Sequence, residues 1–186
     1  MQRVLGLGLR RGALTASSTA AAATMFCASI TAHAAQPGDQ VIVRDLIASK
    51  GWTRVVPLTL NGNGLSDMLS YNARTGRAVY SVGANPPGTQ VIVRDLIASK
   101  GWTAVVPLNL NGDGLSDMLS YNARTGRAVY SVGANPPGTQ VIVRDLIASK
   151  GWTAIVPLKL NNDGLSDMLS YNAKTGRAVY SVAAQP

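Results

Sequence analysis

The sequence has no glutamate, and cysteine, histidine and phenylalanine occur once each, as Cys27, His33 and Phe26. All three single residues lie within the first 34 positions, a stretch with the features of a cleaved export signal. A mature chain without these residue types has no Cys or His nucleophile, no His base, no zinc site and no Glu acid–base pair. These absences exclude most classes of enzyme, and we predict that the protein is not an enzyme.

A strongly hydrophobic run long enough for a permanent membrane helix is also lacking, and residues 1–34 instead follow the pattern of an export signal. Three arginines precede an uncharged stretch over residues 12–32, and Ala32-His33-Ala34 supplies the small residues that a signal peptidase recognises. We expect cleavage before Ala35 and a secreted bacterial protein, extracellular or periplasmic, without a transmembrane anchor. The pair Arg10-Arg11 leaves both the general and the twin-arginine export routes open.

Clustered positive charge is lacking as well. The full chain has 17 Lys and Arg against 9 acidic residues, and loss of the three signal arginines leaves 14 against 9, a net charge of +5. The basic residues are dispersed along the chain, so we expect no nucleic-acid partner. Without cysteine the mature chain also has no disulfides, although its expected location is oxidising.

Repetition is what the sequence has in abundance, because one unit recurs three times with a period of 50 residues. The mature domain over residues 35–186 divides into repeats at 39–88, 89–138 and 139–186. The first two copies differ at only four positions. Such similarity predicts three nearly identical structural units.

Each repeat contains four runs that are typical of strands. In the second repeat the runs are Val91–Ala98, Trp102–Leu110, Asp117–Asn122 and Ala128–Val132. Alternation predicts that Trp102, Val106 and Leu108 share one face of the second run, which we expect to be the most buried strand. Pro107 has no amide hydrogen, so this strand should have a free edge, like the innermost strand of a propeller blade.

We therefore predict an all-β fold, a β-propeller-like array of three four-stranded blades. If VIVRDLIA is the outer strand of a blade, its first copy, Val41–Ala48, is free to complete another blade. Because propellers usually have about four to eight blades, we expect a head-to-tail homodimer. In this dimer each Val41–Ala48 strand pairs with the partner's Ala178–Val182. The alternative is a β-trefoil or β-prism, which closes within one chain.

The turn after the second run is part of a recognisable stretch, GWTAVVPLNLNGDGLSDMLSYNARTGRAVY in the second repeat. This stretch resembles the FG-GAP/VCBS-like repeats of secreted bacterial proteins, integrin-type propellers and related lectins, and the resemblance covers all three copies. The resemblance implies a β-propeller used for recognition, frequently of carbohydrate. It also implies a loop of the pattern D-x-[DN]-x-D-G-x-x-D that often binds Ca²⁺.

Carried over to this sequence, the resemblance implies Ca²⁺ ligands in the second and third loops. They are Asn109, Asn111, Asp113, Asp117 and the Leu115 carbonyl, and then Asn161, Asp163, Asp167 and the Leu165 carbonyl. The first pattern position is never Asp here, and Lys159 places an ammonium at that position in the third loop. Affinity for Ca²⁺ falls with ligand charge, so we expect the strongest site in the second loop. The alternative is a set of tight Asn-Gly turns in which Asp caps backbone N–H groups.

A set of aromatic residues recurs in every repeat and supplies the candidate carbohydrate-binding residues. They are Trp52, Trp102, Trp152, Tyr71, Tyr121, Tyr171, Tyr80, Tyr130 and Tyr180. An aromatic ring can stack on the apolar face of a pyranose, so these residues predict platforms at grooves between blades. The alternative for the tryptophans is that they fill space between blades. Arg94-Asp95 and its copies alternate on the outer strand, where we expect Arg to protect an edge.

The resulting prediction is a secreted, non-enzymatic, lectin-like protein that binds a glycan or other cell-surface ligand multivalently. Repeated weak sites convert modest affinity into avidity. A protein–protein adhesion module and a Ca²⁺-stabilised structural spacer are the alternatives. Hydrolysis of a glycan would need two flanking carboxylates, such as Asp113 and Asp117, but interchangeable copies argue against a catalytic site.

Overall fold

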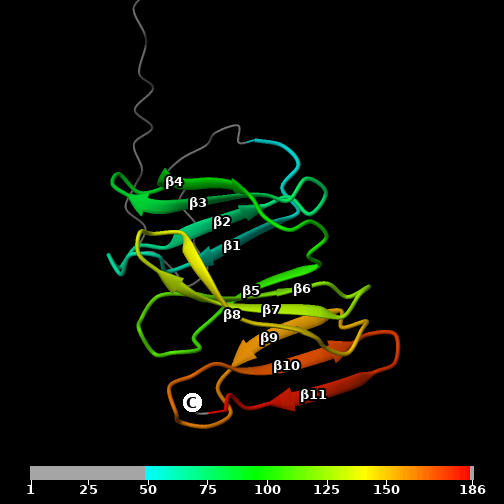
Figure 1. The fold of residues 1–186 in the computed structure, drawn as a ribbon. Helices are drawn as coiled ribbons and strands as arrows, with labels where there is room; N and C mark the ends of the chain where they lie inside the picture. Colours follow the sequence, from blue (N-terminus) through cyan, green and yellow to red (C-terminus); the bar gives the residue numbers. More distant parts are fainter. Residues whose placement is uncertain (1–48, 185–186) are drawn as a thin grey trace, which may run out of the picture. The chain divides into compact units, whose positions relative to one another are not determined.

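A computed structural model of the chain describes residues 49–184, which contain eleven strands and no helix (Figure 1). The strands are β1 (Arg54–Leu58), β2 (Asp67–Tyr71), β3 (Arg77–Ala84), β4 (Thr89–Ile97), β5 (Ala104–Leu108), β6 (Asp117–Tyr121), β7 (Arg127–Ala134), β8 (Thr139–Ile147), β9 (Ala154–Leu158), β10 (Asp167–Asn172) and β11 (Arg177–Ser181). The all-β prediction is confirmed. The expected signal peptide and the Val41–Ala48 strand lie outside the described residues.

The strands form three antiparallel sheets in which each strand pairs with its neighbour in sequence. The orders are β1-β2-β3-β4, β5-β6-β7-β8 and β9-β10-β11. The fourth strand of each complete sheet belongs to the following repeat, because β4 opens repeat 89–138 and β8 opens repeat 139–186. The three sheets do not close on one another.

The four strand-like runs of the second repeat are confirmed as β4, β5, β6 and β7, with shifted ends. Pro107 lies in β5 and pairs only with Met118 of β6, so it occupies the free edge that its missing amide hydrogen requires. The most buried strand is β6 rather than β5, because β6 is paired on both sides.

The outer strands carry a β-bulge at the same place in both complete sheets. Tyr80 pairs with Arg94, whereas Ser81 pairs with Ile92, which leaves Val93 without an opposite residue. The same irregularity occurs between Tyr130 and Ser131. A bulge increases local twist and redirects the neighbouring side chains. Here it precedes the arginine that reaches the next repeat.

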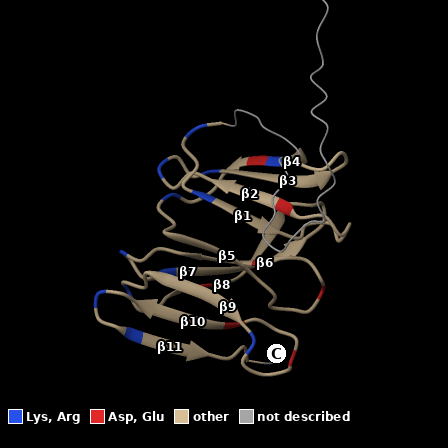
Figure 2. Cartoon of the chain, turned by 180° about the vertical axis from the view of Figure 1, so that it is seen from behind, with Lys and Arg blue, Asp and Glu red and all other residues tan. Residues whose placement is uncertain are grey.

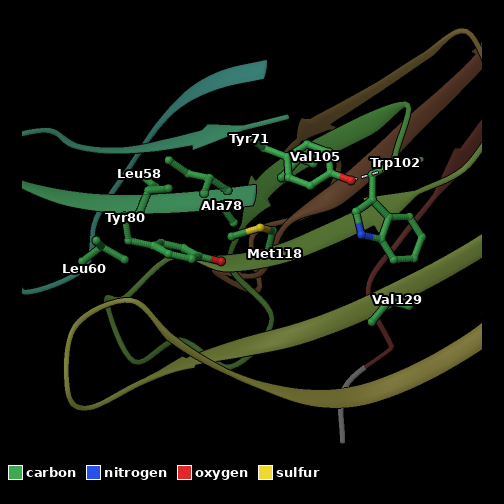
Figure 3. Close-up of a cluster of buried hydrophobic side chains, with 10 residues drawn as sticks. Leu58, Leu60, Tyr71, Ala78, Tyr80, Trp102, Val105, Met118 and Val129 are labelled. Carbon is green, nitrogen blue, oxygen red and sulfur yellow. Dashed lines mark hydrogen bonds between the residues drawn. The ribbon is translucent and has the colours of Figure 1, made fainter. Parts of the chain in front are cut away.

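The core lies between successive sheets (Figure 3). The first cluster combines Leu58, Leu60, Leu69, Tyr71, Ala78 and Tyr80 of the first sheet with Trp102, Val105, Met118 and Val129 of the second repeat. The second cluster is built around Val106, Leu108, Leu119, Tyr121 and Ala128, with Trp152, Ile155 and Met168 of the third repeat packed against it. Adjacent residues of β5 thus face different neighbouring sheets.

The predicted position of Trp102 is wrong in one respect. Trp102 is buried in the first cluster with Val105, whereas Val106 and Leu108 belong to the second cluster. The reason is that β5 begins only at Ala104, and the chain bends at Thr103, between the tryptophan and the strand. The chain turns there, so the alternation of the strand cannot be extended back to the tryptophan.

Successive sheets are joined by the same hydrogen bonds. The Tyr71 hydroxyl accepts from the Trp102 N–H over 3.4 Å (Figure 3). The same hydroxyl donates to the Ser99 carbonyl over 2.7 Å. One repeat later, Tyr121 makes the equivalent bonds over 2.7 and 3.3 Å. The contact between the first and second sheets is therefore repeated between the second and third.

Candidate functional site

A groove lies at each of the two junctions between successive sheets. The groove between the first and second sheets has a volume of about 570 Å³, and the one between the second and third about 500 Å³. Equivalent residues line both: Tyr80/Tyr130, Arg94/Arg144, Leu96/Leu146, Met118/Met168 and Ser131/Ser181. Each groove thus offers an aromatic ring, a guanidinium, apolar side chains and a hydroxyl.

Arg94 is placed in its groove by the outer strand and by the following repeat. Its Nη1 donates to Thr139 Oγ1 over 2.9 Å, across the junction between two repeats. Arg94 is exposed to solvent, as is Arg144. The guanidinium has five N–H donors, so one bond to Thr139 leaves others for a ligand.

Tyr80 forms an apolar wall of the first groove. Its ring packs against Gly138, where an added Cβ would lie 3.0 Å from Tyr80 Cβ. Burial raises the pKa of Tyr80 to about 12, although the charge of Arg94 acts in the opposite direction. Burial likewise raises the pKa of Tyr130. Both phenols are therefore neutral at physiological pH.

The six predicted tyrosines divide into three pairs. Tyr71 and Tyr121 are buried, and their hydroxyls are bonded to backbone carbonyls, so they hold the sheets together. Tyr80 and Tyr130 line the grooves. Tyr171 and Tyr180 are exposed on the third sheet. Of the six, only Tyr80 and Tyr130 combine a packed ring with a place in a groove.

Each tryptophan lies beneath an arginine of its own sheet. The guanidinium carbons of Arg77, Arg127 and Arg177 lie 5.3, 5.3 and 5.2 Å from the ring centres of Trp52, Trp102 and Trp152. Arg127 is also held by Asp145 in a bidentate ion pair with bonds of 3.0 and 2.6 Å. These cation–π contacts occupy one face of each ring and favour the space-filling alternative for the tryptophans. Trp102 nevertheless borders the first groove.

The predicted Ca²⁺ ligands lie in loops whose polar atoms are bonded to the loops themselves. Asp113 Oδ1 accepts from the Leu115 N–H over 2.8 Å, and its Oδ2 accepts from Asn111 Nδ2 over 2.9 Å. Asn109 Oδ1 accepts from the Gly112 N–H over 2.8 Å. These bonds are those of the tight Asn-Gly turn that was the alternative to a metal site.

Asp117 is fully buried and braces the sheet. Its two oxygens accept from the backbone N–H groups of Leu110 over 2.5 Å and Gly133 over 2.9 Å. Asp167 accepts equivalent bonds from Leu160 and Ala183, which lower its pKa below the ordinary value. Backbone donors thus already use both oxygens of each carboxylate.

The third loop follows the same plan, with Asn161 Nδ2 donating to Asp163 Oδ2 over 3.0 Å and the Leu165 N–H donating to Asp163 Oδ1 over 2.9 Å. No group of three His, Cys, Asp or Glu side chains comes together within residues 49–184. The Asn and Asp side chains of these loops stabilise turns and cap backbone N–H groups. In this geometry they do not surround a common point as the carboxylates of a Ca²⁺ site would.

No protein-family model matches the chain, and no curated protein matches it. The resemblance to FG-GAP/VCBS-like repeats therefore remains an interpretation of the motifs in this sequence. Nowhere in residues 49–184 does a helix have the length and apolar character to cross a lipid bilayer.

The arginines of the grooves were not predicted as binding residues. Arg94 and Arg144 were expected to protect the edge of an outer strand, whereas the structure brings each into a groove beside a tyrosine. The available signal was that the arginine, the tyrosine and the methionine all recur at the repeat period, which is typical of a surface built by repetition.

Proposed function

We propose that this chain is a secreted, non-enzymatic recognition protein that binds carbohydrate in the grooves between successive sheets. The observation that carries the proposal is the recurrence of five groove positions, including Tyr80/Tyr130 and Arg94/Arg144, at two separate junctions. Equivalent grooves present the same ligand-binding chemistry twice in one chain. Two weak sites on one molecule bind a repetitive surface more tightly than either site alone.

The chemistry of the grooves suits a sugar. A pyranose has an apolar face that packs on an aromatic ring and hydroxyls that accept hydrogen bonds from Arg, Tyr and Ser. The described residues that line the two grooves include no Asp. A glycosidase needs a pair of carboxylates across the scissile bond, so this lining supports binding without hydrolysis.

We interpret the sheets as blades of a β-propeller-like array. Each complete sheet is a four-stranded meander whose first strand, β1 or β5, lies at a free edge, as expected for an inner strand. A β-trefoil or β-prism would close within the chain, whereas these sheets do not close on one another. The strand order and the resemblance to FG-GAP/VCBS-like repeats together support blades.

The distribution of charge supports a glycan partner over a nucleic acid. Figure 2 shows Lys and Arg positions dispersed over turns and strands of the cartoon instead of gathered in one stripe. Two of them form bidentate ion pairs with aspartates, Arg77 with Asp95 and Arg127 with Asp145. A phosphate backbone is bound by clustered, available cations.

A glycan array with the purified chain tests this function. We expect binding that free sugar competes for and that the double variant Arg94→Ala/Arg144→Ala reduces at least tenfold. The matched control is Arg74→Ala/Arg124→Ala, which removes the same charge from exposed turns outside the grooves. Binding to cells that resists free sugar would instead identify a protein-adhesion module. Absence of any binding would favour the structural spacer.

A further inference from the structure

The third sheet has a free edge where the other two sheets have a fourth strand. Within the described residues it consists of β9, β10 and β11, whereas β3 and β7 are each covered by an outer strand. Those outer strands contain VIVRDLIA at 91–98 and 141–148, and the remaining copy of this octapeptide is Val41–Ala48. The sequence therefore contains one more copy of the outer-strand octapeptide than the two complete sheets use.

Side chains that are buried in the first sheet are exposed in the third. Tyr80 is 6% exposed and Tyr71 2%, but Tyr180 is 63% and Tyr171 39% exposed. Leu160 and Val182 are also exposed on this face. In the first sheet the equivalent residues pack against Trp102 and Val105 of the second. The third sheet thus presents a surface shaped to receive another sheet.

The first sheet presents the complementary surface. Val55 in β1 is 57% exposed, whereas its counterpart Val105 in β5 is only 7% exposed because it packs on the preceding sheet. The chain therefore has a donor surface at one end of its series of sheets and a receptor surface at the other. Their contact would repeat the step already made twice inside the chain.

The chain's own Val41–Ala48 segment is tied to the first sheet by a short linker. Only residues 49–53 separate Val41–Ala48 from β1, and a linker this short spans at most about 18 Å. This short linker favours pairing of the segment with a sheet next to the first one. Within the chain the inner strands contact in the order β1, β5, β9, so the second sheet lies between the first and the third.

We propose that a second copy of this chain completes the third sheet. The copy adds residues 39–48 beside β11 and packs its first sheet on the exposed face of the third, which repeats the internal junction. In the register of β3 and β4, Arg177 lies opposite Ile47, Tyr180 opposite Arg44, and Val182 opposite Val41. The proposal does not depend on which ligand the grooves bind.

Two ion pairs follow from this register. Arg77 pairs with Asp95 and Arg127 with Asp145, so Arg177 is expected to pair with Asp45 of the added strand. Arg94 bonds to Thr139, and the residue equivalent to Thr139 in the added strand is Asp39. Arg144 would therefore face a carboxylate instead of a hydroxyl. The first repeat has Asp39 where the second has Thr89, and the negative charge of Asp39 is complementary to the positive charge of Arg144.

The contact is heterologous, because different surfaces of each copy meet. Two copies joined head to tail form two identical interfaces and close as a ring of six sheets, within the range of about four to eight blades for propellers. Closure also completes the groove between the second and third sheets, because the added strand brings Gly38 and Asp39 to the place of Gly138 and Thr139 beside Tyr130 and Arg144.

A pair of cysteines tests the proposal directly. The full chain carries Cys27→Ser with Val41→Cys and Val182→Cys, because Val82 pairs with Val91 in the first sheet. Under mild oxidation we expect a covalent dimer that thiol reagents revert to monomer. The control replaces Val41→Cys by Ile42→Cys, one residue out of register, and should cross-link far less. A monomeric band, a ladder of higher species, or equal cross-linking of the control would overturn the proposal.

Charge reversal gives an independent readout by light scattering. We expect a native mass of twice that of the chain, a loss to the monomer mass with Asp45→Arg or Arg177→Asp, and recovery in the double variant. Arg127→Asp is the matched control, because it breaks the equivalent pair inside the chain and should lower the melting temperature without halving the mass. An unchanged mass in both single variants, or no recovery in the double variant, contradicts the predicted register.

Discussion

The carboxylate of Asp117 accepts a hydrogen bond over 2.9 Å from the backbone N–H of Gly133, sixteen residues later in the chain. Its other oxygen accepts from the Leu110 N–H, and the side chain is fully buried. Asp67 makes the equivalent pair of bonds with Leu60 and Gly83. One buried acid per repeat therefore ties the loop after the inner strand to the end of the third strand.

We predict that Asp117→Asn destabilises the protein, because an amide presents one acceptor and one donor to two N–H groups. One buried donor loses its partner, at a cost of about 1–3 kcal/mol in the free energy of unfolding. Denaturant unfolding measures the change. The control is Asp113→Asn on the exposed turn, for which we expect a change within about 0.5 kcal/mol. Equal effects of the two variants would contradict a bracing role for Asp117.

Calcium binding in the second loop remains a prediction from the family resemblance. If it holds, added Ca²⁺ releases or absorbs heat in a calorimetric titration and raises the melting temperature, because a ligand that binds the folded state stabilises it. Asp113→Asn should remove the stronger site and leave only the weaker signal of the third loop, whereas Asn63→Asp in the first loop should add a site. No heat and no shift in melting temperature would leave the loops as tight turns only.

The phenol of Tyr80 in the first groove should ionise at a higher pH than an ordinary tyrosine. Burial raises the pKa of Tyr80 to about 12, so the folded state keeps its proton while the unfolded state loses it near the ordinary value of 10.0. The contribution of this group to stability is full below pH 10 and is lost as the pH rises toward 12. Ultraviolet titration of the folded protein should show a phenol ionising at this high pH that disappears in Tyr80→Phe. Normal ionisation of all six tyrosines would exclude this environment.

Acid should weaken the third sheet through Asp167. Backbone N–H donors from Leu160 and Ala183 lower its pKa in the folded state, so its contribution is present above the ordinary pKa of 3.8 and is lost as the pH falls through the lower folded value. Denaturant unfolding at a series of acidic pH values should show the free energy of unfolding falling in this window. The slope should be shallower in Asp167→Asn. An identical slope in the variant would assign the acid sensitivity to other carboxylates.

Much of the fold could be predicted from local features of the sequence. Strand alternation and Asn-Gly or Pro-Gly turns located all four strands of a repeat, and the missing amide of Pro107 placed β5 at an edge. The position of Trp102 could not be predicted in this way, because a bend at Thr103 interrupts the alternation between the tryptophan and the strand. Two-residue alternation predicts the face on which a side chain lies only as long as the backbone stays extended.

The candidate groove was harder to foresee. Its key contact joins Arg94 to Thr139, 45 residues apart, across a junction between sheets. The bulge at Val93, beside Arg94, has no signature in composition or hydrophobicity. The tyrosines were found because aromatic rings are conspicuous in the sequence, but only tertiary structure separates the buried Tyr71 from the groove-lining Tyr80.

Because each complete sheet takes its outer strand from the next repeat, no repeat of this chain supplies a whole sheet alone. A duplication or loss of one fifty-residue unit would preserve the contacts at the remaining internal junctions, because each unit needs the same outer strand from the unit that follows. The number of grooves could therefore change in steps of one by recombination between copies. The number of binding grooves in the protein can thus follow the number of repeats, while the contacts between neighbouring sheets stay the same.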